Sequence, residues 1–194
     1  QSWGILDYNN YAFSGNGWTK YTIPVGQTLS AGSYPYLTLV NDFDGGSGSN
    51  SYIKDVRIYD GVIIVDNDDG SPAYEETGTW STSSYNGYND GTYRYAWAGQ
   101  VKTATWNLNL PAPGSWTISV IYRAGTNRAT SAKYTVQTAS GPQTVYVDQT
   151  QNNLTWVTLG TWDFNENEGS ITLDAEGSSG GSGAVISDAV KAEK

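Results

Sequence analysis

Residues 111–123 read PAPGSWTISVIYR, and this stretch decides the fold class. The Pro and Gly residues at 111–114 are typical of a turn. The residues that follow alternate between apolar and polar, and the apolar side consists of Trp116, Ile118, Val120 and Tyr122. Because successive side chains of an extended chain point to opposite faces, this period of two predicts a half-buried β-strand that starts after a turn.

The same alternation recurs in short segments along the chain, and no segment shows the period of an amphipathic helix. These segments are 104–108, 134–136, 144–147, 155–159 and 170–173. Clusters of Gly, Asn, Ser and Pro separate them, which is typical of an all-β chain. We therefore predict an antiparallel β-sandwich or jelly roll. Four Trp residues are expected in its core, namely Trp80, Trp106, Trp116 and Trp156.

Charge and residue types exclude several classes of function. The chain has 194 residues, with 10 Lys and Arg against 19 Asp and Glu, so its formal net charge is −9. An acidic surface disfavours nucleic acid and anionic membranes as partners. Cys and His are both absent, which removes thiol and imidazole catalysis and the usual zinc ligands. The chain has no apolar run long enough to span a membrane. Its richness in Gly, Trp and Tyr is typical of a secreted all-β protein.

We predict a domain boundary near residue 60. Residues 1–60 hold three or four alternating segments, too few to bury a core alone. This N-terminal β segment is therefore expected to pack on the rest of the chain. Residues 61–194 are expected to form a complete sandwich. Within it, the Gly-rich stretch 177–183 is expected to be a surface loop that precedes a closing strand at 184–190.

Several short motifs follow one another in the second part of the chain. They are VDNDD at 65–69, GTWS at 78–81, YRYA at 93–96, ATW at 104–106, LPAPG at 110–114, GTNRAT at 125–130, YTV at 134–136, WVTLG at 156–160 and SDAV at 187–190. In these motifs residues 62–192 resemble the golvesin C-terminal-like domain, which is also found at the ends of xanthan-lyase-like and other secreted bacterial polysaccharide-active proteins. The resemblance implies a β-sandwich and assigns no catalytic residues.

The first part of the chain carries a second resemblance. Its motifs are LVNDFDG at 39–45 and KDVRIYD at 54–60. In these motifs the segment is similar to the second half of several jelly-roll carbohydrate-binding modules, including calcium-dependent xylan-binding ones. Sixty residues are too few for a whole module of that kind, so the resemblance covers a fragment.

Two acidic loops are candidate calcium sites, NDFDG at 41–45 and DNDDG at 66–70. In each loop, Asp residues precede a Gly that allows a tight turn, and carboxylate oxygens are ligands that Ca²⁺ prefers. The alternative is a turn in which Asp caps its own backbone. The predicted Ca²⁺ ligands at the first loop are Asp42, Asp44, Asn41 and Asp55, and Lys54 is the rival partner, which would make the loop an ordinary ion pair.

Aromatic residues are interspersed with turn and polar residues in segment 85–97, YNGYNDGTYRYAW. Sugar rings have an apolar face that stacks on Trp or Tyr, and hydroxyls that hydrogen-bond to Asn, Asp or Arg. Tyr85 and Tyr88, in the Gly- and Asn-rich part, are expected to be exposed. At 127–128, Asn and Arg can clamp a sugar group, or the Arg can instead hold its own loop. The candidate carbohydrate-binding residues are Tyr85, Tyr88, Trp97, Arg94, Asn127 and Arg128.

These features favour a non-catalytic carbohydrate-binding accessory module of a secreted bacterial polysaccharide-degrading enzyme. Its partners would be a polysaccharide and the neighbouring catalytic domain. The alternative is a structural, adhesion or spacer module without glycan affinity. A catalytic domain ranks third, because without His only carboxylate or Tyr mechanisms remain. Exposed coplanar aromatic rings would favour glycan binding, whereas a deep cleft with two opposed carboxylates would favour catalysis.

The kind of glycan follows from the charge of the chain. A net charge of −9 favours neutral glycans over polyanions. An acidic glycan would need Ca²⁺ or a local group of cations, for which the candidates are Arg94, Arg123, Arg128 and Lys133.

Overall fold

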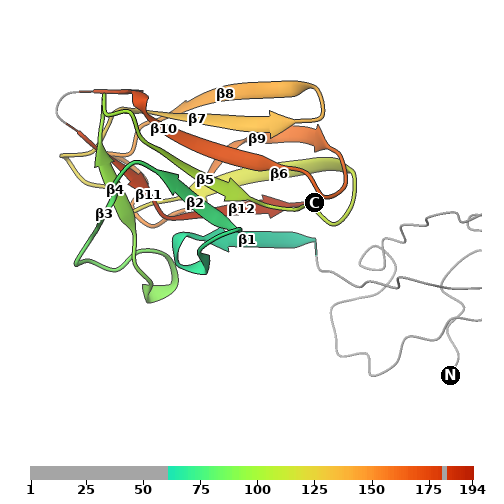
Figure 1. The fold of residues 1–194 in the computed structure, drawn as a ribbon, viewed down its shortest axis with the longest axis horizontal. Helices are drawn as coiled ribbons and strands as arrows, with labels where there is room; N and C mark the ends of the chain where they lie inside the picture. The colour runs from blue at the N-terminus through green and yellow to red at the C-terminus, as the bar shows by residue number, and fades with distance from the viewer. Residues whose placement is uncertain (1–60, 181–182) are drawn as a thin grey trace, which may run out of the picture. The chain divides into compact units, whose positions relative to one another are not determined.

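A computed structural model describes residues 61–180 and 183–194. In Figure 1 these residues form an all-β fold. The strands are β1 (Val62–Asp66), β2 (Tyr74–Thr77), β3 (Ser81–Thr82), β4 (Arg94–Trp97), β5 (Thr103–Asn107), β6 (Gly114–Ile121), β7 (Ser131–Thr138), β8 (Gly141–Val147), β9 (Val157–Phe164), β10 (Ser170–Ser179), β11 (Ala184–Ser187) and β12 (Ala189–Glu193). The described helices are two single turns, η1 (Asn67–Asp69) and η2 (Tyr88–Asp90).

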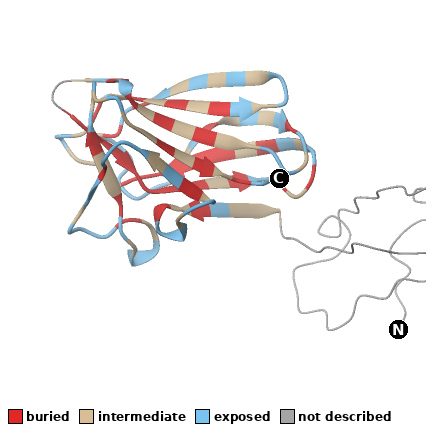
Figure 2. Cartoon of the chain, in the orientation of Figure 1, coloured by how far each residue is buried: buried red, intermediate tan, exposed pale blue. Residues whose placement is uncertain are grey.

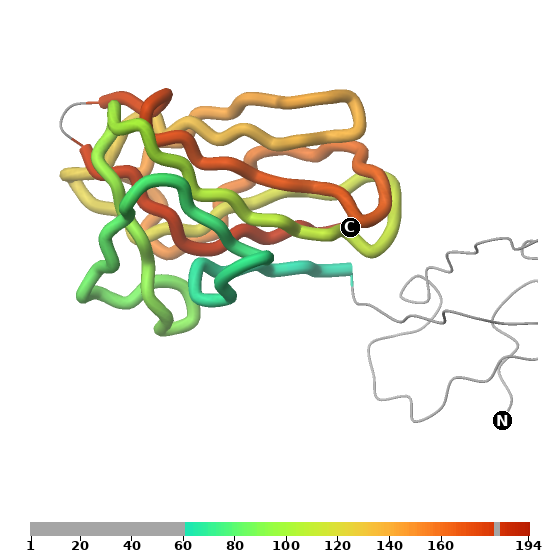
Figure 3. The backbone as a smooth tube through the Cα atoms, viewed as in Figure 1, coloured from blue at the N-terminus to red at the C-terminus, as the bar shows by residue number. Residues whose placement is uncertain are grey.

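The strands form two large antiparallel sheets and one small one. The four-stranded sheet has the order β1-β12-β6-β9, and the five-stranded sheet has the order β2-β5-β10-β7-β8. A three-stranded sheet, β11-β4-β3, lies at one end of the sandwich, as Figure 1 shows. Figure 3 traces how β1 and β12, the first and last described strands, run side by side. The predicted antiparallel β-sandwich is confirmed for these residues.

The core lies between the two large sheets, and alternate residues are buried in strands such as β5 and β7 (Figure 2). The four-stranded sheet contributes Ile118 and Val190, and the five-stranded sheet contributes Trp106, Tyr134 and Ile171; each is at most 1% exposed. This is the period of two expected of strands that face a core on one side. Three of the four Trp residues predicted to be in the core are buried, namely Trp80, Trp106 and Trp116.

Trp156 is half-buried and lies outside the core, so its prediction is wrong. The next residue, Val157, packs against the core, so the alternation turns Trp156 to the outer face of the four-stranded sheet. The ammonium group of Lys191 lies 5.4 Å from the centre of the Trp156 ring. Lys191 itself points outward, because both of its neighbours in β12 are buried. Trp156 is therefore part of the surface.

The acidic loop at 66–70 is a capped turn. The side chain of Asp66 accepts a hydrogen bond from the backbone N–H of Asp68 at 2.8 Å, and the backbone N–H of Asp66 donates to the carboxylate of Asp69 at 2.8 Å. This reciprocal pair closes η1 as a capping box. The turn alternative therefore describes this loop. The loop at 41–45 and the whole of residues 1–60 lie outside the described residues.

The C-terminal part differs from its prediction in two ways. The expected single strand at 184–190 is two strands, because Asp188 interrupts it where the chain passes from the small sheet to the four-stranded one. The expected Gly-rich loop is shorter, because β10 continues through Ser179. There the hydroxyl of Ser178 accepts a hydrogen bond from the backbone N–H of Lys133 at 2.9 Å, which keeps β10 joined to β7 past an irregularity in their register.

Candidate functional site

The loop between β3 and β4, residues 83–93, carries the predicted sugar-binding tyrosines. Asp188 holds this loop, since both oxygens of its carboxylate accept the backbone N–H of Tyr88, at 3.0 and 3.2 Å. A Cβ atom at Gly87 would lie 2.8 Å from both of those oxygens and 2.6 Å from the carbonyl oxygen of Thr92. Only glycine fits so close an approach, so sequence and packing together fix the loop over Asp188.

Three aromatic side chains, two from this loop and one from the residue directly before β9, form the aromatic surface, which we define as Tyr85, Tyr88 and Trp156. The Tyr88 and Trp156 rings lie 5.4 Å apart, centre to centre, at 60° to each other. Tyr85 is 64% exposed, as predicted, whereas Tyr88 is half-buried because it packs on Trp156. The Tyr88 and Trp156 rings are not coplanar, so this pair does not form the coplanar row of rings that would favour glycan binding over a spacer role.

Arg123 extends this surface from the end of β6. Its guanidinium lies 5.3 Å from the centre of the Tyr85 ring and donates a hydrogen bond to the carbonyl of Asn86 at 2.9 Å. A cation over an aromatic face is attracted by the electron density of the ring. The stacked pair keeps Tyr85 in place although the ring is mostly exposed.

Arg128 is held by its own loop, as the structural alternative proposed. Its Nε donates to the carbonyl of Arg123 at 3.2 Å, its Nη1 to the side chain of Asn127 at 2.8 Å, and its Nη2 to the hydroxyl of Tyr93 at 3.1 Å. The guanidinium also lies 5.9 Å from the centre of the Tyr93 ring. Asn127 is exposed and Arg128 is half-buried, so both still reach the surface.

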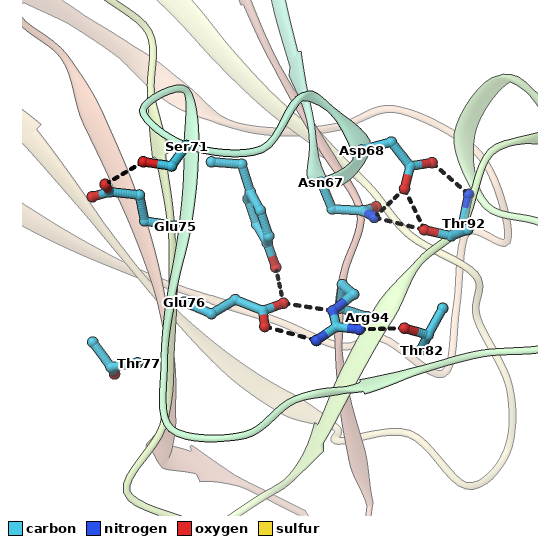
Figure 4. A pocket seen from close by; sticks show the side chains of 10 residues that line it. Asn67, Asp68, Ser71, Glu75, Glu76, Thr77, Thr82, Thr92 and Arg94 are labelled. Carbon is cyan, nitrogen blue, oxygen red and sulfur yellow. Dashed lines mark hydrogen bonds and ion pairs between the residues drawn. The ribbon is translucent and has the colours of Figure 1, made fainter.

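Arg94 lies apart from the aromatic surface, in an open groove of about 870 Å³ between β2 and β4 (Figure 4). Its guanidinium makes a bidentate ion pair with Glu76, with Nε–Oε1 and Nη2–Oε2 distances of 2.7 and 2.8 Å. It also donates to the carbonyl of Trp80 and to the hydroxyl of Thr82. These partners hold Arg94 as a link between the two strands.

Two carboxylates in the groove are occupied by protein donors. Glu76 accepts from Arg94 and from the hydroxyl of Tyr74, the latter at 2.8 Å. Asp68 accepts from the backbone N–H of Thr92 at 2.7 Å, and also from its hydroxyl. Among the described residues, no group of three or more carboxylates lies close enough to hold a metal ion.

Trp97, the remaining candidate, lies at the end of β4 away from the loop at 83–93. It is 47% exposed and its ring meets that of Tyr95 edge to face, with centres 6.3 Å apart. The candidates are therefore not gathered in one place. Tyr85 and Tyr88 share one loop, Asn127 and Arg128 share another, and Arg94 and Trp97 are separate.

Sequence reasoning missed Trp156 and Asp188 as parts of this region, and it named Arg123 only as a candidate cation for an acidic glycan. Trp156 was assigned to the core because a Trp in an alternating segment is more often buried. Asp188 stands in an apolar segment, AVISDAV, and an acid in such a segment is the one signal that could have marked it. Arg123 comes just after a core strand, and nothing in the sequence around it indicates that Tyr85 lies beside it.

Comparison with known proteins gives the family. The golvesin C-terminal domain family matches residues 63–194. The chain belongs to this family. Xanthan lyase of Bacillus sp. (strain GL1) is 34% identical over 138 residues, which cover 66% of this chain and 14% of the lyase. The chain thus corresponds to a small part of that relative.

Solved structures agree with this assignment. The structure of Paenibacillus xanthan lyase matches with a TM-score of 0.62 and 30% identity, over 70% of this chain and 13% of that one. A family 35 carbohydrate-binding module from Clostridium thermocellum matches with a TM-score of 0.50 and 17% identity, over 68% of this chain and 98% of the module. At that identity the likeness is one of fold. The described residues include no helix long and apolar enough to cross a membrane.

Proposed function

We propose that this golvesin C-terminal domain is a non-catalytic carbohydrate-binding accessory module of a secreted bacterial polysaccharide-degrading enzyme. The observation that carries the proposal is the aromatic surface, on which Tyr85 is largely exposed beside the Tyr88–Trp156 pair. Such rings offer apolar faces to the C–H side of a sugar, and the exposed Asn86 and Asn127 supply hydrogen-bonding groups nearby.

The comparisons support this context. Two relatives are xanthan lyases, in which the matching region is a small part of a larger enzyme. A module that binds polysaccharide would keep such an enzyme close to its substrate by raising the local concentration. Two of the three carboxylates that line the groove support a non-catalytic role, because Glu76 is tied to Arg94 and Asp68 to Thr92. The third, Glu75, is exposed and accepts a hydrogen bond from the hydroxyl of Ser71.

Binding to polysaccharides, with xanthan as the first, tests the proposal. In affinity electrophoresis, Tyr85→Ala and Trp156→Ala should each reduce the retardation of the protein. The dissociation constant should rise about tenfold, because burying part of an aromatic ring contributes about 1.4 kcal/mol to the binding free energy. Tyr146→Ala is the matched control, because Tyr146 is 58% exposed but belongs to β8 in the other large sheet.

Thermal melting of each variant separates loss of binding from loss of folding. If no polysaccharide retards the unaltered protein, or if Tyr146→Ala weakens binding as much as Tyr85→Ala, the proposal is wrong. Absence of binding would favour the alternative of a spacer module.

A further inference from the structure

Some of the Lys and Arg residues that the structure describes form ion pairs with a carboxylate, and others do not. Arg94 is paired with Glu76, Lys133 with Asp174, and Lys191 with Glu193. Within residues 61–180 and 183–194, neither Arg123 nor Arg128 has a carboxylate within ion-pair distance. Lys102 and Lys194 have no ion pair there either, but Arg123 and Arg128 in addition contact each other, through a hydrogen bond to the Arg123 backbone.

The side chains of these two arginines are each held in place. Arg128 donates through Nε to the backbone carbonyl of Arg123. The Arg123 guanidinium stacks on Tyr85 and that of Arg128 on Tyr93. Their acceptors are all neutral: two backbone carbonyls, an amide oxygen and a phenol. Each guanidinium is thus held in place by neutral groups alone, so each keeps a full positive charge that favours a bound anion.

The hydrogen-bonding capacity of the pair is also incomplete. A guanidinium has five N–H groups in a planar fork that fits a carboxylate. Within the described residues, Arg123 uses one donor bond and Arg128 uses three. Because stacking and hydrogen bonds already restrict both side chains, an incoming carboxylate would order them at little further cost in conformational entropy.

We propose that Arg123 and Arg128 form a carboxylate subsite beside the aromatic surface, so that the module binds acidic polysaccharides that carry uronate or similar carboxyl groups. This inference rests on the proposed function and names its ligand class. It reverses the expectation of a neutral glycan, because the local charge at these two residues is opposite to the net charge of the chain. A sugar ring on Tyr85 would bring its carboxylate close to the Arg123 guanidinium that stacks on the same ring.

The test compares one polysaccharide with and without its charge. The probes are xanthan and alginate, each also as a derivative in which the uronates have been reduced to neutral hexoses. The full chain should bind the acidic form about tenfold more tightly than the reduced form, which is the usual effect of one charge-assisted hydrogen-bonded contact. That preference should weaken as salt is added, because salt screens an exposed ion pair.

Arg123→Gln should bring the ratio of the two affinities close to one, and Arg123→Lys should restore only part of it because the planar fork is lost. Arg123 is the better target, since Arg128 also holds its loop; Arg128→Gln is tested only if its melting temperature is unchanged. Lys194→Gln is the control that removes a positive charge at the opposite end of β6, where Lys194 contacts Pro113.

The outcomes separate the two proposals. Equal binding of acidic and reduced polysaccharides, or an unchanged ratio in Arg123→Gln, overturns the carboxylate subsite and leaves carbohydrate binding intact. A ratio that falls equally in Lys194→Gln also overturns it, because the effect would then follow net charge. If neither form binds, the proposed function itself fails, and the subsite fails with it.

Discussion

Asp188 is the residue on which the candidate site depends most. It is 1% exposed, and besides holding Tyr88 through its carboxylate it accepts the indole N–H of Trp106 and the backbone N–H of Asn67 at its carbonyl oxygen. Burial is the main cause that raises the pKa of the Asp188 carboxyl to about 7; the hydrogen bond from Tyr88 opposes this rise, and the charges of Asp66 and Asp68 contribute to it. The carboxyl therefore titrates near neutral pH.

A pH-dependent stability follows from this pKa. The folded-state pKa lies above the usual value of 3.8, so the folded state binds more protons between these values, and stability should fall as pH rises from about 4 to about 7. The loss is on the order of 4 kcal/mol, since one pKa unit corresponds to about 1.4 kcal/mol. Asp188→Asn should flatten this part of the profile and raise the melting temperature at pH 8.

The measurement is denaturant unfolding at several pH values, with Asp163→Asn as the control because Asp163 is exposed. If Asp188→Asn unfolds more easily than the unaltered protein at pH 8, the buried carboxylate does not destabilise the folded state and the prediction is wrong.

At the scale of elements, β11 is completed by a side chain. It pairs with β4 on one edge; on the other edge Ala184 bonds to the backbone of residues 127 and 129, and at Ile186 the buried amide of Gln149 takes the place of a strand. The Gln149 side chain donates to the carbonyl of Ile186 and accepts from its backbone N–H, both at 2.8 Å, and donates to the hydroxyl of Tyr134 at 3.0 Å. Gln149 therefore anchors the small sheet to the sandwich.

Removing this amide should be costly. Gln149→Leu keeps the volume but leaves the buried backbone groups of Ile186 and the hydroxyl of Tyr134 without partners, which should destabilise the fold by about 3 kcal/mol or more. Chemical denaturation measures the change. Gln151→Leu, in the same loop but exposed, should change stability by less than about 0.5 kcal/mol. Similar losses in both variants would mean that the loop, rather than the buried amide, matters.

At the scale of the whole molecule, the sandwich is closed by its last strand. β12 lies between β1 and β6 and pairs with both, and its Val190 and Ala192 side chains enter the core. A strand with partners on both edges cannot be lost without exposing two ladders of backbone groups.

Two truncations test this arrangement. The fragment 61–194 should fold by itself, since its hydrophobic core is complete within the described residues. The fragment 61–188, which lacks β12, should not fold. Circular dichroism and amide dispersion in NMR spectra distinguish the two. A cooperative melting transition in the shorter fragment would show that β1 and β6 do not require the strand between them.

The fold could be predicted well from the sequence, and the site only in part. Alternation such as that of 116–122 is a local property, so it marked the strands and most of the core. The exposed position of Tyr85 also followed from its Gly- and Asn-rich surroundings. The outward orientation of Trp156 could not be predicted in this way. A period of two shows which residues share one side of a strand, but not which side faces the core.

The sequence by itself determined the all-β fold of the described residues, the lack of thiol and imidazole side chains, and the motifs of a golvesin C-terminal domain. These are properties of composition and of short segments. Only the tertiary structure decided that Trp156 joins Tyr88 on the surface, that Glu76 neutralises Arg94, and that Arg123 and Arg128 stand together without an acid. Such partnerships join residues far apart in the chain, and the packing of the sheets brings them together.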